Sequence, residues 1–380
     1  MPHHNTVFRE VLKLMPWHRV EALVEEHGAD ARARRLPTKV QLVALLYGQL
    51  SGASGLREIV TALSSHEARL YHLGATSVRR STFSDANANR PFAVFTELLE
   101  LMMKQAHRGL RRKMAEAIYL IDATSVRLNR YSADWAQFSA GVCGAKVHVI
   151  YDAEADRPIY AAVTAANIND ITAAHQMPIE PGATYVFDLG YYDYLWWAAL
   201  DAAGCRIVTR FKSNTPLDVI EELAVAPTGK ILSDRIGFLP ARQAKSRRNP
   251  MQDAVREVRV MTDTGKVLRI LSNDLDAPAE EIAELYRRRW AIELFFRWVK
   301  QTLKITRFVG ISENAVRIQI AVALIAFLLL RLAQASQKAV QSPLVFARLV
   351  RANLMQRRSI QNLLKPPPTP QDERQISLAI

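Results

Sequence analysis

The middle of the chain, residues 117–211, consists of short apolar segments separated by turn residues, and their order restricts the fold more than any other feature. AIYLID, AKVHVIYD and RPIYAAVTA are continuous or alternating in apolar character, as β-strands are, with the turn DAEADRP between the last two. NDITAAHQM then predicts a short helix, ATYVFDLG a strand, YYDYLWWAALDAAG a helix and CRIVTRF a strand. Three strands followed by helix, strand, helix and strand predict a mixed sheet with helices packed on it.

The segments on either side have different patterns. The first hundred or so residues have the apolar spacing of helices, including a long helix after Pro91. From residue 214 to about 274 the chain is basic and favours strands, and AVREVRVMT and KVLRILSN flank DTG, which predicts a hairpin. Helix is expected again from about Pro278, through residues 286–300, and the tail LKPPPTPQDERQ is expected to be disordered.

Charge and composition limit the function. The net charge is +13 over 380 residues, which favours a polyanionic partner, nucleic acid before a membrane, with solubility alone as the alternative. Cys143 and Cys205 form no metal-binding pattern and suit buried positions in a reducing compartment. No signal peptide is expected, and the longest apolar run, residues 320–330, is too short to span a bilayer and predicts a buried helix. We therefore expect a cytoplasmic protein, able to reach the nucleoid if it is bacterial.

The stretch YRRRWAIELFFRWVK, residues 286–300, contains one glutamate among cations and aromatics. At about 100° per residue, four of its side chains share an arc of roughly 60° on a single helix: Tyr286, Arg289, Glu293 and Lys300. Arg297 and Trp290 lie close beside this arc. A salt-bridged surface helix would mix its charges more evenly, so the single carboxylate flanked by cations needs another explanation.

Two aspartates suggest that explanation. Asp122 and Asp188 each close a predicted apolar strand, where a charged side chain is costly unless it is paired, bound to metal or at the sheet edge. With Glu293 on a later helix, they can converge on one point. Carboxylate oxygens are the ligands that Mg²⁺ prefers, and two such ions can promote phosphoryl transfer. The alternative is that the aspartates are ordinary turn or cap residues, and three rival acids lie nearby: Asp152, Asp156 and Asp193.

In this hypothesis the cations hold phosphates while Glu293 holds a metal. Arg and Lys supply positioning contacts to a nucleic-acid backbone, and Tyr286 can donate a hydroxyl hydrogen bond. We expect Arg289 and Lys300 to bind phosphates and not to pair with Glu293, because an exposed Arg–Glu pair four residues apart contributes only about 0.3–0.5 kcal/mol. Packing against the sheet is the interpretation favoured for Trp290 and the alternative for Tyr286.

These residues resemble a known family. The YREK signature of DDE transposases from bacterial insertion sequences is matched in residue type and in all three gaps by four residues: Tyr286, Arg289, Glu293 and Lys300. IDATSV around Asp122 and FDLGYYDY around Asp188 are similar to the two aspartate segments of the insertion-sequence-four family, and VTRFKSNT is similar to the strand that follows. LSGASGLREIV and STFSDANANRP resemble the helical domain that precedes the catalytic core in one branch of that family.

The resemblance implies an α/β fold: a ribonuclease-H-like mixed-sheet catalytic core with a β-rich insertion, preceded by an all-helical N-terminal domain. The implied regions are a helical DNA-binding domain at 1–113, a catalytic domain at 114–335 with the insertion at about 214–275, and a C-terminal helical segment with a disordered tail at 336–380.

The resemblance also implies the chemistry. Catalytic metal ligands for two Mg²⁺ ions, for which Mn²⁺ can substitute, would be Asp122, Asp188 and Glu293. DNA-binding residues would be Tyr286, Arg289, Arg297 and Lys300. The implied activity is cleavage of double-stranded DNA at the terminal inverted repeats of an element and joining of the freed 3′ ends to target DNA, within a homodimer that holds both ends. No membrane partner is expected.

Members of the family often release the element through a DNA hairpin, with an aromatic side chain of the insertion stacked on a flipped base, a step that costs a few kcal/mol of unstacking. Between residues 214 and 274 this chain has no Trp or Tyr, and Phe238 is its only aromatic residue. The hairpin step and its stacking residue therefore stay open.

Two other functions are weighed against transposition. One is a nuclease of the same fold that cuts without joining strands, which the basic insertion and the YREK helix disfavour. The other is a non-catalytic DNA-binding protein descended from a transposase, which the presence of all three acids disfavours. The helical N-terminal region fits a DNA-binding module or a solvated helical domain equally, and arginines fall in its connections: Arg32, Arg34, Arg35, Arg79 and Arg80.

Overall fold

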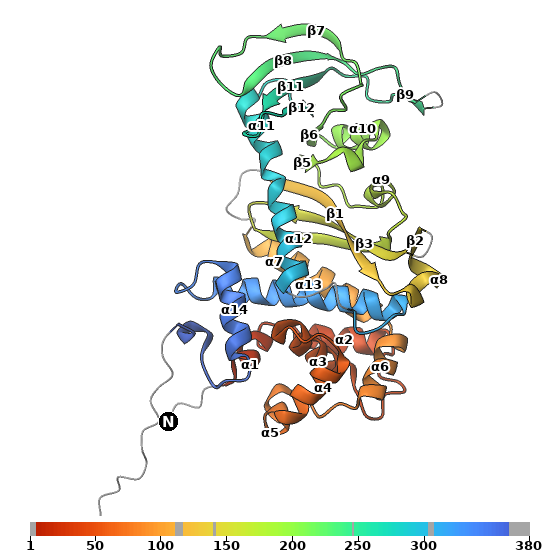
Figure 1. The fold of residues 1–380 in the computed structure, drawn as a ribbon, viewed down its shortest axis with the longest axis vertical. Coiled ribbons are helices and arrows are strands. Elements are labelled where there is room, and N and C mark those ends of the chain that lie inside the picture. The colour runs from red at the N-terminus through yellow and green to blue at the C-terminus, as the bar shows by residue number, and fades with distance from the viewer. Residues whose placement is uncertain (1–4, 111–116, 140–141, 245–246, 303–307, 365–380) are drawn as a thin grey trace, which may run out of the picture.

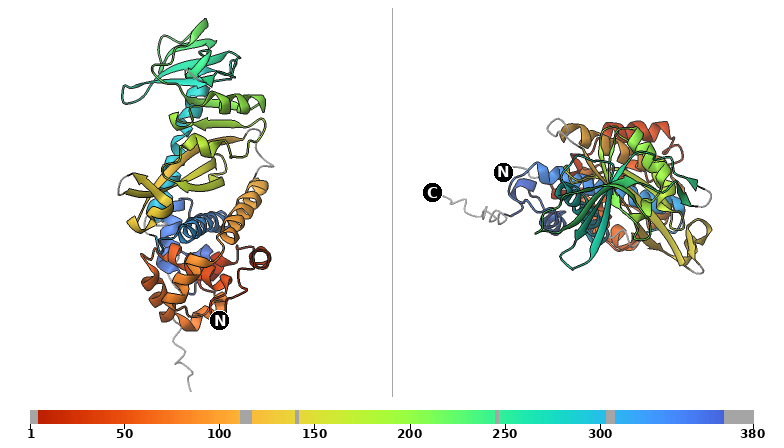
Figure 2. Two further views of the ribbon diagram at one scale, coloured as in Figure 1. Left: turned by 90° about the vertical axis from the view of Figure 1, so that its right-hand side faces the viewer. Right: turned by 90° about the horizontal axis from the view of Figure 1, so that it is seen from above.

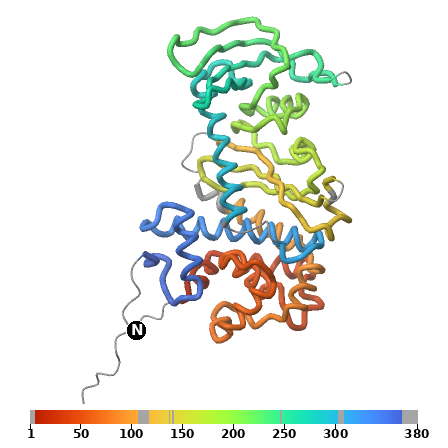
Figure 3. Tube along the Cα trace, viewed as in Figure 1, coloured from red at the N-terminus to blue at the C-terminus, as the bar shows by residue number. Residues whose placement is uncertain are grey.

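A computed structural model describes residues 5–110, 117–139, 142–244, 247–302 and 308–364. Along its longest axis the protein has three parts (Figure 1): helices at one end, the core of a mixed sheet in the middle, and further strands at the other end. The Cα trace shows that the N-terminal helices and the last helix of the chain lie at the same end (Figure 3).

The N-terminal region is helical, as predicted. Its helices are α1 (Val7–Leu12), α2 (Trp17–Glu26), α3 (Thr38–Ser51), α4 (Leu56–Ser65), α5 (Glu67–Leu70), η1 (Tyr71–Leu73), α6 (Arg80–Asn89) and α7 (Ala93–Leu110). Apolar residues run all round α3, and nearly all of its side chains are buried, so α3 is the centre of this region. It ends at Gly52, whose φ of 74° forms a left-handed cap that suits glycine.

The apolar run at 320–330 lies in α13 (Glu313–Ala335). Length and composition would allow α13 to cross a membrane, but 83% of its most apolar window is buried inside the protein. It packs against α3, α6, α7 and α14, and in Figure 1 it lies between the N-terminal helices and the sheet. The predicted buried helix is therefore confirmed, and α13 belongs to the core.

The core sheet has the predicted order of elements, with a short strand and two short helical segments in addition between the first two predicted strands. Its strands are β1 (Ile118–Leu128), β2 (Gln137–Ser139), β3 (Val142–Asp152), β4 (Arg157–Ala165), β5 (Thr184–Phe187) and β6 (Arg206–Arg210). Between them lie η3 (Arg130–Ser132), α8 (Ala133–Ala136), α9 (Asp170–Ala174), η4 (Leu189–Tyr191) and α10 (Tyr194–Ala202). β4, β3 and β1 pair antiparallel, whereas β1, β5 and β6 pair in parallel. The order β4-β3-β1-β5-β6 is the predicted ribonuclease-H-like core.

β1 is longer than the sequence predicted. Its pairing with β3 continues as far as Leu128 opposite Cys143, so Asp122 does not close the strand and that prediction is wrong. The parallel pairing with β5 is shorter and ends at Leu120 opposite Val186. Beyond Leu120, β3 is the only partner of β1 among the described strands, and β1 becomes partly exposed, which explains how the strand can continue through an aspartate.

The β-rich insertion extends the same sheet. Its strands are β7 (Asp218–Leu223), β8 (Ile231–Phe238), β9 (Arg242–Ala244), β10 (Arg247–Arg248), β11 (Val255–Met261) and β12 (Val267–Ser272). β12 pairs antiparallel with β6, and β11, β8 and β7 follow in that order, whereas β9 and β10 form a separate two-stranded sheet. The predicted hairpin is β11–β12, with Gly265 at a φ of 77° in its turn. Figure 2 shows these strands beyond the core, at the end opposite the helices.

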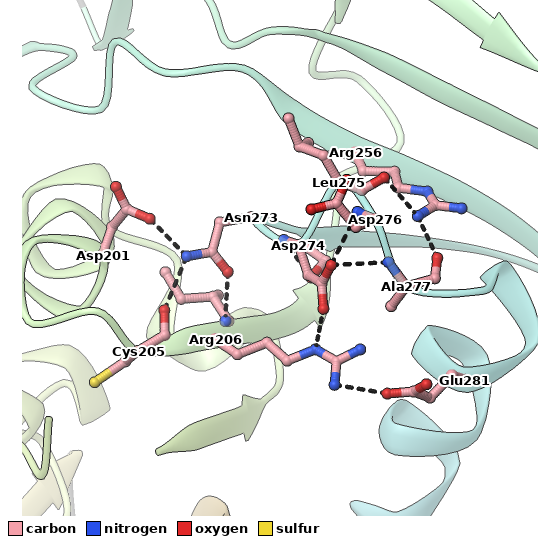
Figure 4. A network of polar contacts seen from close by, with 12 residues as sticks. Asp201, Cys205, Arg206, Arg256, Asn273, Asp274, Leu275, Asp276, Ala277 and Glu281 are labelled. Atoms are coloured by element: carbon pink, nitrogen blue, oxygen red, sulfur yellow. Dashed lines mark hydrogen bonds and ion pairs between the residues drawn. The ribbon is translucent and has the colours of Figure 1, made fainter. Parts of the chain in front are cut away.

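Polar contacts hold the end of the insertion against the core (Figure 4). Asn273 accepts the Ile207 amide at 2.7 Å and donates to the Cys205 carbonyl at 2.8 Å. Arg206 Nε lies 2.8 Å from Asp274 Oδ2, and its Nη1 lies 2.7 Å from Glu281 on the next helix. The start of β6, the end of β12 and the following helix are thus joined.

Two helices in line, α11 (Ala279–Arg288) and α12 (Trp290–Thr302), replace the single helix that was predicted. At Arg289 the hydrogen bonds tighten to three-residue spacing, from Arg289 N to Tyr286 O and from Ile292 N to Arg289 O. α11 packs on the insertion strands and β6, whereas α12 packs on β1 and reaches α13. This rod therefore runs past the whole length of the sheet (Figure 1).

The C-terminal helix α14 (Pro343–Asn353) packs on α3, α1 and α13, and η5 (Ile360–Asn362) follows it. A bridge between Thr6 and Arg357 also joins the two ends of the chain. The predicted disordered tail lies largely outside the described residues.

Candidate active site

Asp122 and Asp188 come from neighbouring strands. Because Leu120 pairs with Val186, each aspartate lies two residues further along its own strand. Asp188 follows the last residue of β5 and caps η4, where its Oδ1 accepts the Gly190 amide at 2.8 Å. The two aspartates are therefore side by side where β1 and β5 diverge, as expected for residues that share one site.

Glu293 reaches the same place from α12. The Arg289 guanidinium links it to β1: Nη2 donates to Glu293 Oε1 at 2.5 Å, and Nη1 lies 3.6 Å from Asp122 Oδ2. The expectation that Arg289 does not pair with Glu293 is therefore wrong for the protein without DNA. That expectation assumed an exposed pair, whereas the Arg289 side chain is only 16% exposed.

The charges of Asp188 and Glu293 act on Asp122. The pKa of Asp122 is raised to about 6, first by burial, with the charges of Asp188 and Glu293 acting in the same direction. The Ala123 amide and Arg289 act in the opposite direction. Negative charges gathered in a partly buried place disfavour ionisation, so this is a position where a cation would be favourable.

The donor set fits a divalent metal ion, because carboxylate oxygens are the ligands that Mg²⁺ prefers. In the part of the chain that the structure describes, however, no group of three His, Cys, Asp or Glu side chains is placed to hold an ion as it stands. Arg289 lies between Asp122 and Glu293 and pairs with both. A metal ion shared by these two carboxylates therefore requires Arg289 to move.

Tyr286 and Lys300 also lie near the acids. Tyr286 is buried on α11, the Arg289 guanidinium lies 5.8 Å from the centre of its ring, and the charge of Asp188 acts on its hydroxyl. Burial lowers the pKa of Lys300, and the charge of Asp122 opposes this effect. The structure thus brings both residues within electrostatic reach of the aspartates.

Arg297 and Trp290 lie on the exposed side of α12. The Arg297 guanidinium is 6.0 Å from the centre of the Trp290 ring. Trp290 is 51% exposed, so the prediction that it packs against the sheet is wrong. With Tyr286 and Arg289 it lines a cavity of about 750 Å³ between the rod and the insertion strands.

Arg210 was missed by the sequence interpretation. It ends β6, one residue after Thr209, which pairs with Phe187, so it lies at the level of Asp188 on the adjacent strand. Its charge acts on Tyr286, and its Nε is buried with no hydrogen-bond partner among the described residues. The available signal was an arginine at the end of an apolar strand, in VTRF.

The three rival acids have structural roles. Asp152 accepts two amides of the β3–β4 turn, from Glu154 at 3.1 Å and Ala155 at 2.9 Å. Asp156 pairs with Arg331 at 2.7 Å and accepts the Tyr151 hydroxyl. Asp193 caps α10 through the Trp196 amide at 3.0 Å and pairs with Arg247 at 3.2 Å.

The five arginines expected in the N-terminal connections are all exposed, although Arg80 is the first residue of α6: Arg32, Arg34, Arg35, Arg79 and Arg80. Arg90 in STFSDANANRP is instead buried and donates to Gln41 Oε1 at 3.1 Å. Gln41 donates to Asn87 at 2.7 Å, and Asn314 of α13 donates to the Asn87 and Arg90 carbonyls at 2.9 and 2.7 Å. This part of the motif therefore joins α6 to α13.

A ribonuclease-H-like sheet that gathers an aspartate from each of two neighbouring strands and a glutamate from a later helix defines the class of enzymes with a DDE active site. The sequence profile of the family described as "Transposase DDE domain" matches residues 113–329, and the chain belongs to this family. Residues 3–76 match a second family, described as a domain of unknown function (DUF4372).

Similar proteins carry related names. A putative transposase, y4zB, of Sinorhizobium fredii is 39% identical over 285 residues, which cover 75% of this chain and 80% of the relative. A probable transposase for insertion sequence element IS5377 of Geobacillus stearothermophilus is 28% identical and covers 66% of each chain. The solved piggyBac transposase synaptic complex with hairpin DNA has a TM-score of 0.48 and 10% identity, covering 96% of this chain and 83% of the other, a similarity too low to establish a common fold.

Proposed function

We propose that this protein is the transposase of a bacterial insertion sequence in the insertion-sequence-four family. It binds the inverted repeats of its element, cleaves them by Mg²⁺-dependent phosphoryl transfer and joins the 3′ ends to target DNA. One observation carries the proposal: Asp122, Asp188 and Glu293, far apart in the sequence, gather beside Arg289. Membership in the DDE transposase family and the complete YREK spacing support it.

Asp122, Asp188 and Glu293 are the residues that would hold the metal. When bound, Mg²⁺ or Mn²⁺ activates the attacking oxygen and stabilises the leaving one. Arg289 changes partner when DNA arrives, because two oxygens of a phosphate can accept a pair of parallel hydrogen bonds from the planar guanidinium. Its departure frees the oxygens of Asp122 and Glu293, so DNA binding and metal binding favour each other.

The other cations position the DNA backbone. Lys300 and Tyr286 lie on either side of Arg289 along the rod and bind phosphates of the reacting strand, together with Arg210 from β6. Arg297 is exposed beside Trp290 and contacts DNA further from the cleaved bond. Backbone contacts of this kind fix register and orientation without reading sequence.

The N-terminal helices, with their exposed arginines, bind the inverted repeats, and two copies of the chain hold the two ends of the element together. The protein acts in the cytoplasm, at the nucleoid. The net charge of +13 supports a polyanionic partner such as DNA.

The DNA that flanks the gene provides the substrate for the test. We expect inverted repeats there, nicking at their ends in Mg²⁺, and joining of those ends to a target plasmid. Asp122→Asn, Asp188→Asn and Glu293→Gln should each abolish cleavage and keep end binding, because affinity comes mainly from phosphate contacts. Asp156→Asn, at a rival acid paired with Arg331, is the matched control and should cleave normally. Nicks without joining would identify a nuclease, and binding without nicks an inert descendant.

A further inference from the structure

A fourth carboxylate, Asp170, lies beside the proposed active site. It begins α9, the short helix between β4 and β5. A Cβ atom placed on Gly190 would lie 3.0 Å from Asp188 Oδ1 and 3.1 Å from Asp170 Oδ2. The two carboxylate oxygens therefore border the same small space beside η4, and a glycine keeps that space open.

A buried histidine on β3 lies beside the other oxygen of Asp170. His148 is fully buried, and its Nε2 is paired with Thr164 Oγ1 at 2.8 Å. Its Nδ1 has no hydrogen-bond partner among the described residues and lies 3.8 Å from Asp170 Oδ1. Because Nε2 is paired with Thr164 Oγ1, Nδ1 is the ring nitrogen that can bond to water.

A buried tyrosine reaches the same group of acids. Tyr191 is fully buried in η4, and its hydroxyl has no hydrogen-bond partner in the part of the chain that the structure describes. Burial raises the pKa of Tyr191, and the charges of Asp170, Asp122 and Asp188 act in the same direction. Buried polar atoms almost always have a partner, so this hydroxyl is available to a water molecule or a ligand.

An ion pair with Lys146 does not account for these atoms. Lys146 Nζ lies 3.0 Å from Asp170 Oδ1 and 2.9 Å from the Ile168 carbonyl, whereas Asp170 Oδ2 is the oxygen beside Gly190. A purely structural Lys146–Asp170 pair would not explain why the Tyr191 hydroxyl and His148 Nδ1 are buried without a hydrogen-bond partner among the described residues.

We propose that Asp170 is a fourth carboxylate of the active site, which with Asp188 holds a hydrated divalent cation whose water molecules bond to Tyr191 and His148. This inference rests on the proposed function and extends its metal site to α9. Two carboxylates with water completing the shell are a usual way for a protein to bind Mg²⁺.

The test measures cation binding directly. Full-length protein, bound to a duplex with the flanking inverted repeats, is titrated with Mn²⁺ and followed by electron paramagnetic resonance. Asp170→Asn should weaken Mn²⁺ binding by about tenfold or more, the usual effect of losing a group that supports a metal. The Mg²⁺ concentration for half-maximal cleavage should rise in parallel. Tyr191→Phe removes only the hydroxyl and should weaken Mn²⁺ binding by a smaller factor, even if Asp170→Asn fails to fold.

Lys146→Met is the control for a structural ion pair. If Asp170 serves only Lys146, this variant should reproduce the loss seen in Asp170→Asn, and the inference is overturned. If Asp170 binds the cation, Lys146→Met should keep or strengthen Mn²⁺ binding, because a competing positive charge is gone. Wild-type Mn²⁺ binding in folded Asp170→Asn, or in Tyr191→Phe if the first does not fold, would also overturn it. If Asp122→Asn loses Mn²⁺ binding while Asp170→Asn keeps it, this inference fails and the proposed function stands. If Asp122→Asn keeps Mn²⁺ binding, the three-carboxylate site itself is refuted.

Discussion

Asp122 sits on a central strand where burial and two neighbouring carboxylates oppose its ionisation. Arg289 partly offsets this cost in the protein without DNA, because it lies between Asp122 and Glu293. The same guanidinium is suited to a DNA phosphate. At the residue scale, the positive charge of Arg289 therefore opposes the repulsion among several carboxylates. Substituting these residues one at a time tests each contribution.

The raised pKa predicts that Asp122→Asn stabilises the protein at neutral pH. A folded-state pKa of about 6, against an ordinary value of 3.8, favours folding only while the group is protonated, and that contribution is lost as pH rises toward and above 6. The difference between these two pKa values corresponds to nearly 3 kcal/mol. Because Asp122→Asn also loses the Arg289 contact, we expect the free energy of unfolding to rise by about 1–2 kcal/mol at pH 7.5.

Urea unfolding in metal-free buffer at pH 7.5 and pH 4.5 checks this. The advantage of Asp122→Asn should shrink as pH falls from about 6 toward 4, because wild-type Asp122 then becomes neutral. An advantage of equal size at both pH values would show that the raised pKa is not its cause.

Arg289→Ala should lower the cleavage rate by about 100-fold, as removal of a preorganised donor at a reacting group commonly does. Arg289→Lys should also be impaired, because a point charge does not reproduce a two-pronged contact. Without DNA, Arg289→Ala should bind Mn²⁺ more tightly than wild type, since Asp122 and Glu293 lose their competing cation. Single-turnover cleavage and a Mn²⁺ titration measure the two effects.

Arg287→Ala is the matched control. This exposed neighbour pairs with Glu284 at 2.6 Å, away from the acids, and its loss should leave both measurements near wild type. Normal turnover by well-folded Arg289→Ala would rule out the phosphate role of Arg289.

At the element scale, the insertion and the rod of α11 and α12 hold the site in place. Arg256 on β11 forms a two-pronged pair with Asp234 on β8, at 2.8 and 2.6 Å, and also donates to the carbonyls of Leu275 and Ala277 before α11. The pair is almost fully buried, at 5% and 4% exposure. It joins the insertion strands to the segment from which the rod begins.

Asp234→Ala should therefore cost about 3–5 kcal/mol of stability, because it leaves the Arg256 charge buried without the carboxylate that neutralises it. The double variant Asp234→Leu with Arg256→Met should recover much of this loss, since it removes both charges. Thermal melting of the wild type, Asp234→Ala and the double variant measures whether their stabilities follow this order. Equal stability of Asp234→Ala and wild type would show that the pair does not hold the insertion.

At the scale of the whole molecule, the helical end is built from both ends of the chain. α13 packs against α3, α6 and α7, and α14 packs on α1 and α3. Arg69 donates to the Met355 carbonyl at 2.6 Å, and Asn314 completes the buried network of α6. The boundaries at residues 113 and 335 remain predictions, but the described packing of the N-terminal helices depends on α13 and α14.

A fragment of residues 1–110 should therefore not fold cooperatively by itself, because it lacks the helices that cover α3. Circular dichroism melting of this fragment, compared with the full chain, measures this. Adding residues 308–364 through a flexible linker should restore a cooperative transition. A sharp transition in the short fragment would show that α13 and α14 are dispensable for its core.

The sequence by itself determined the parts of this protein that depend on local periodicity and spacing. Alternating apolar residues and turn signals predicted the strands and helices from 117 to 211, the β11–β12 hairpin and the helical N-terminal region. The spacing of Tyr286, Arg289, Glu293 and Lys300 and the two strand-associated aspartates predicted which residues gather. These features are readable because each follows from neighbours within a few residues along the chain.

The tertiary structure decided what depends on pairing between distant segments. The register of β1 against β3 and β5 carried the strand past Asp122, and the packing of α12 on β1 placed Arg289 between two acids and left Trp290 exposed. The roles suggested for Arg210 and Asp170 arise because β6 ends beside β5 and α9 begins beside η4, neighbours that are far apart in the sequence. Sequence spacing limits which residues share a face, but only long-range packing sets which charges meet and how deeply they are buried.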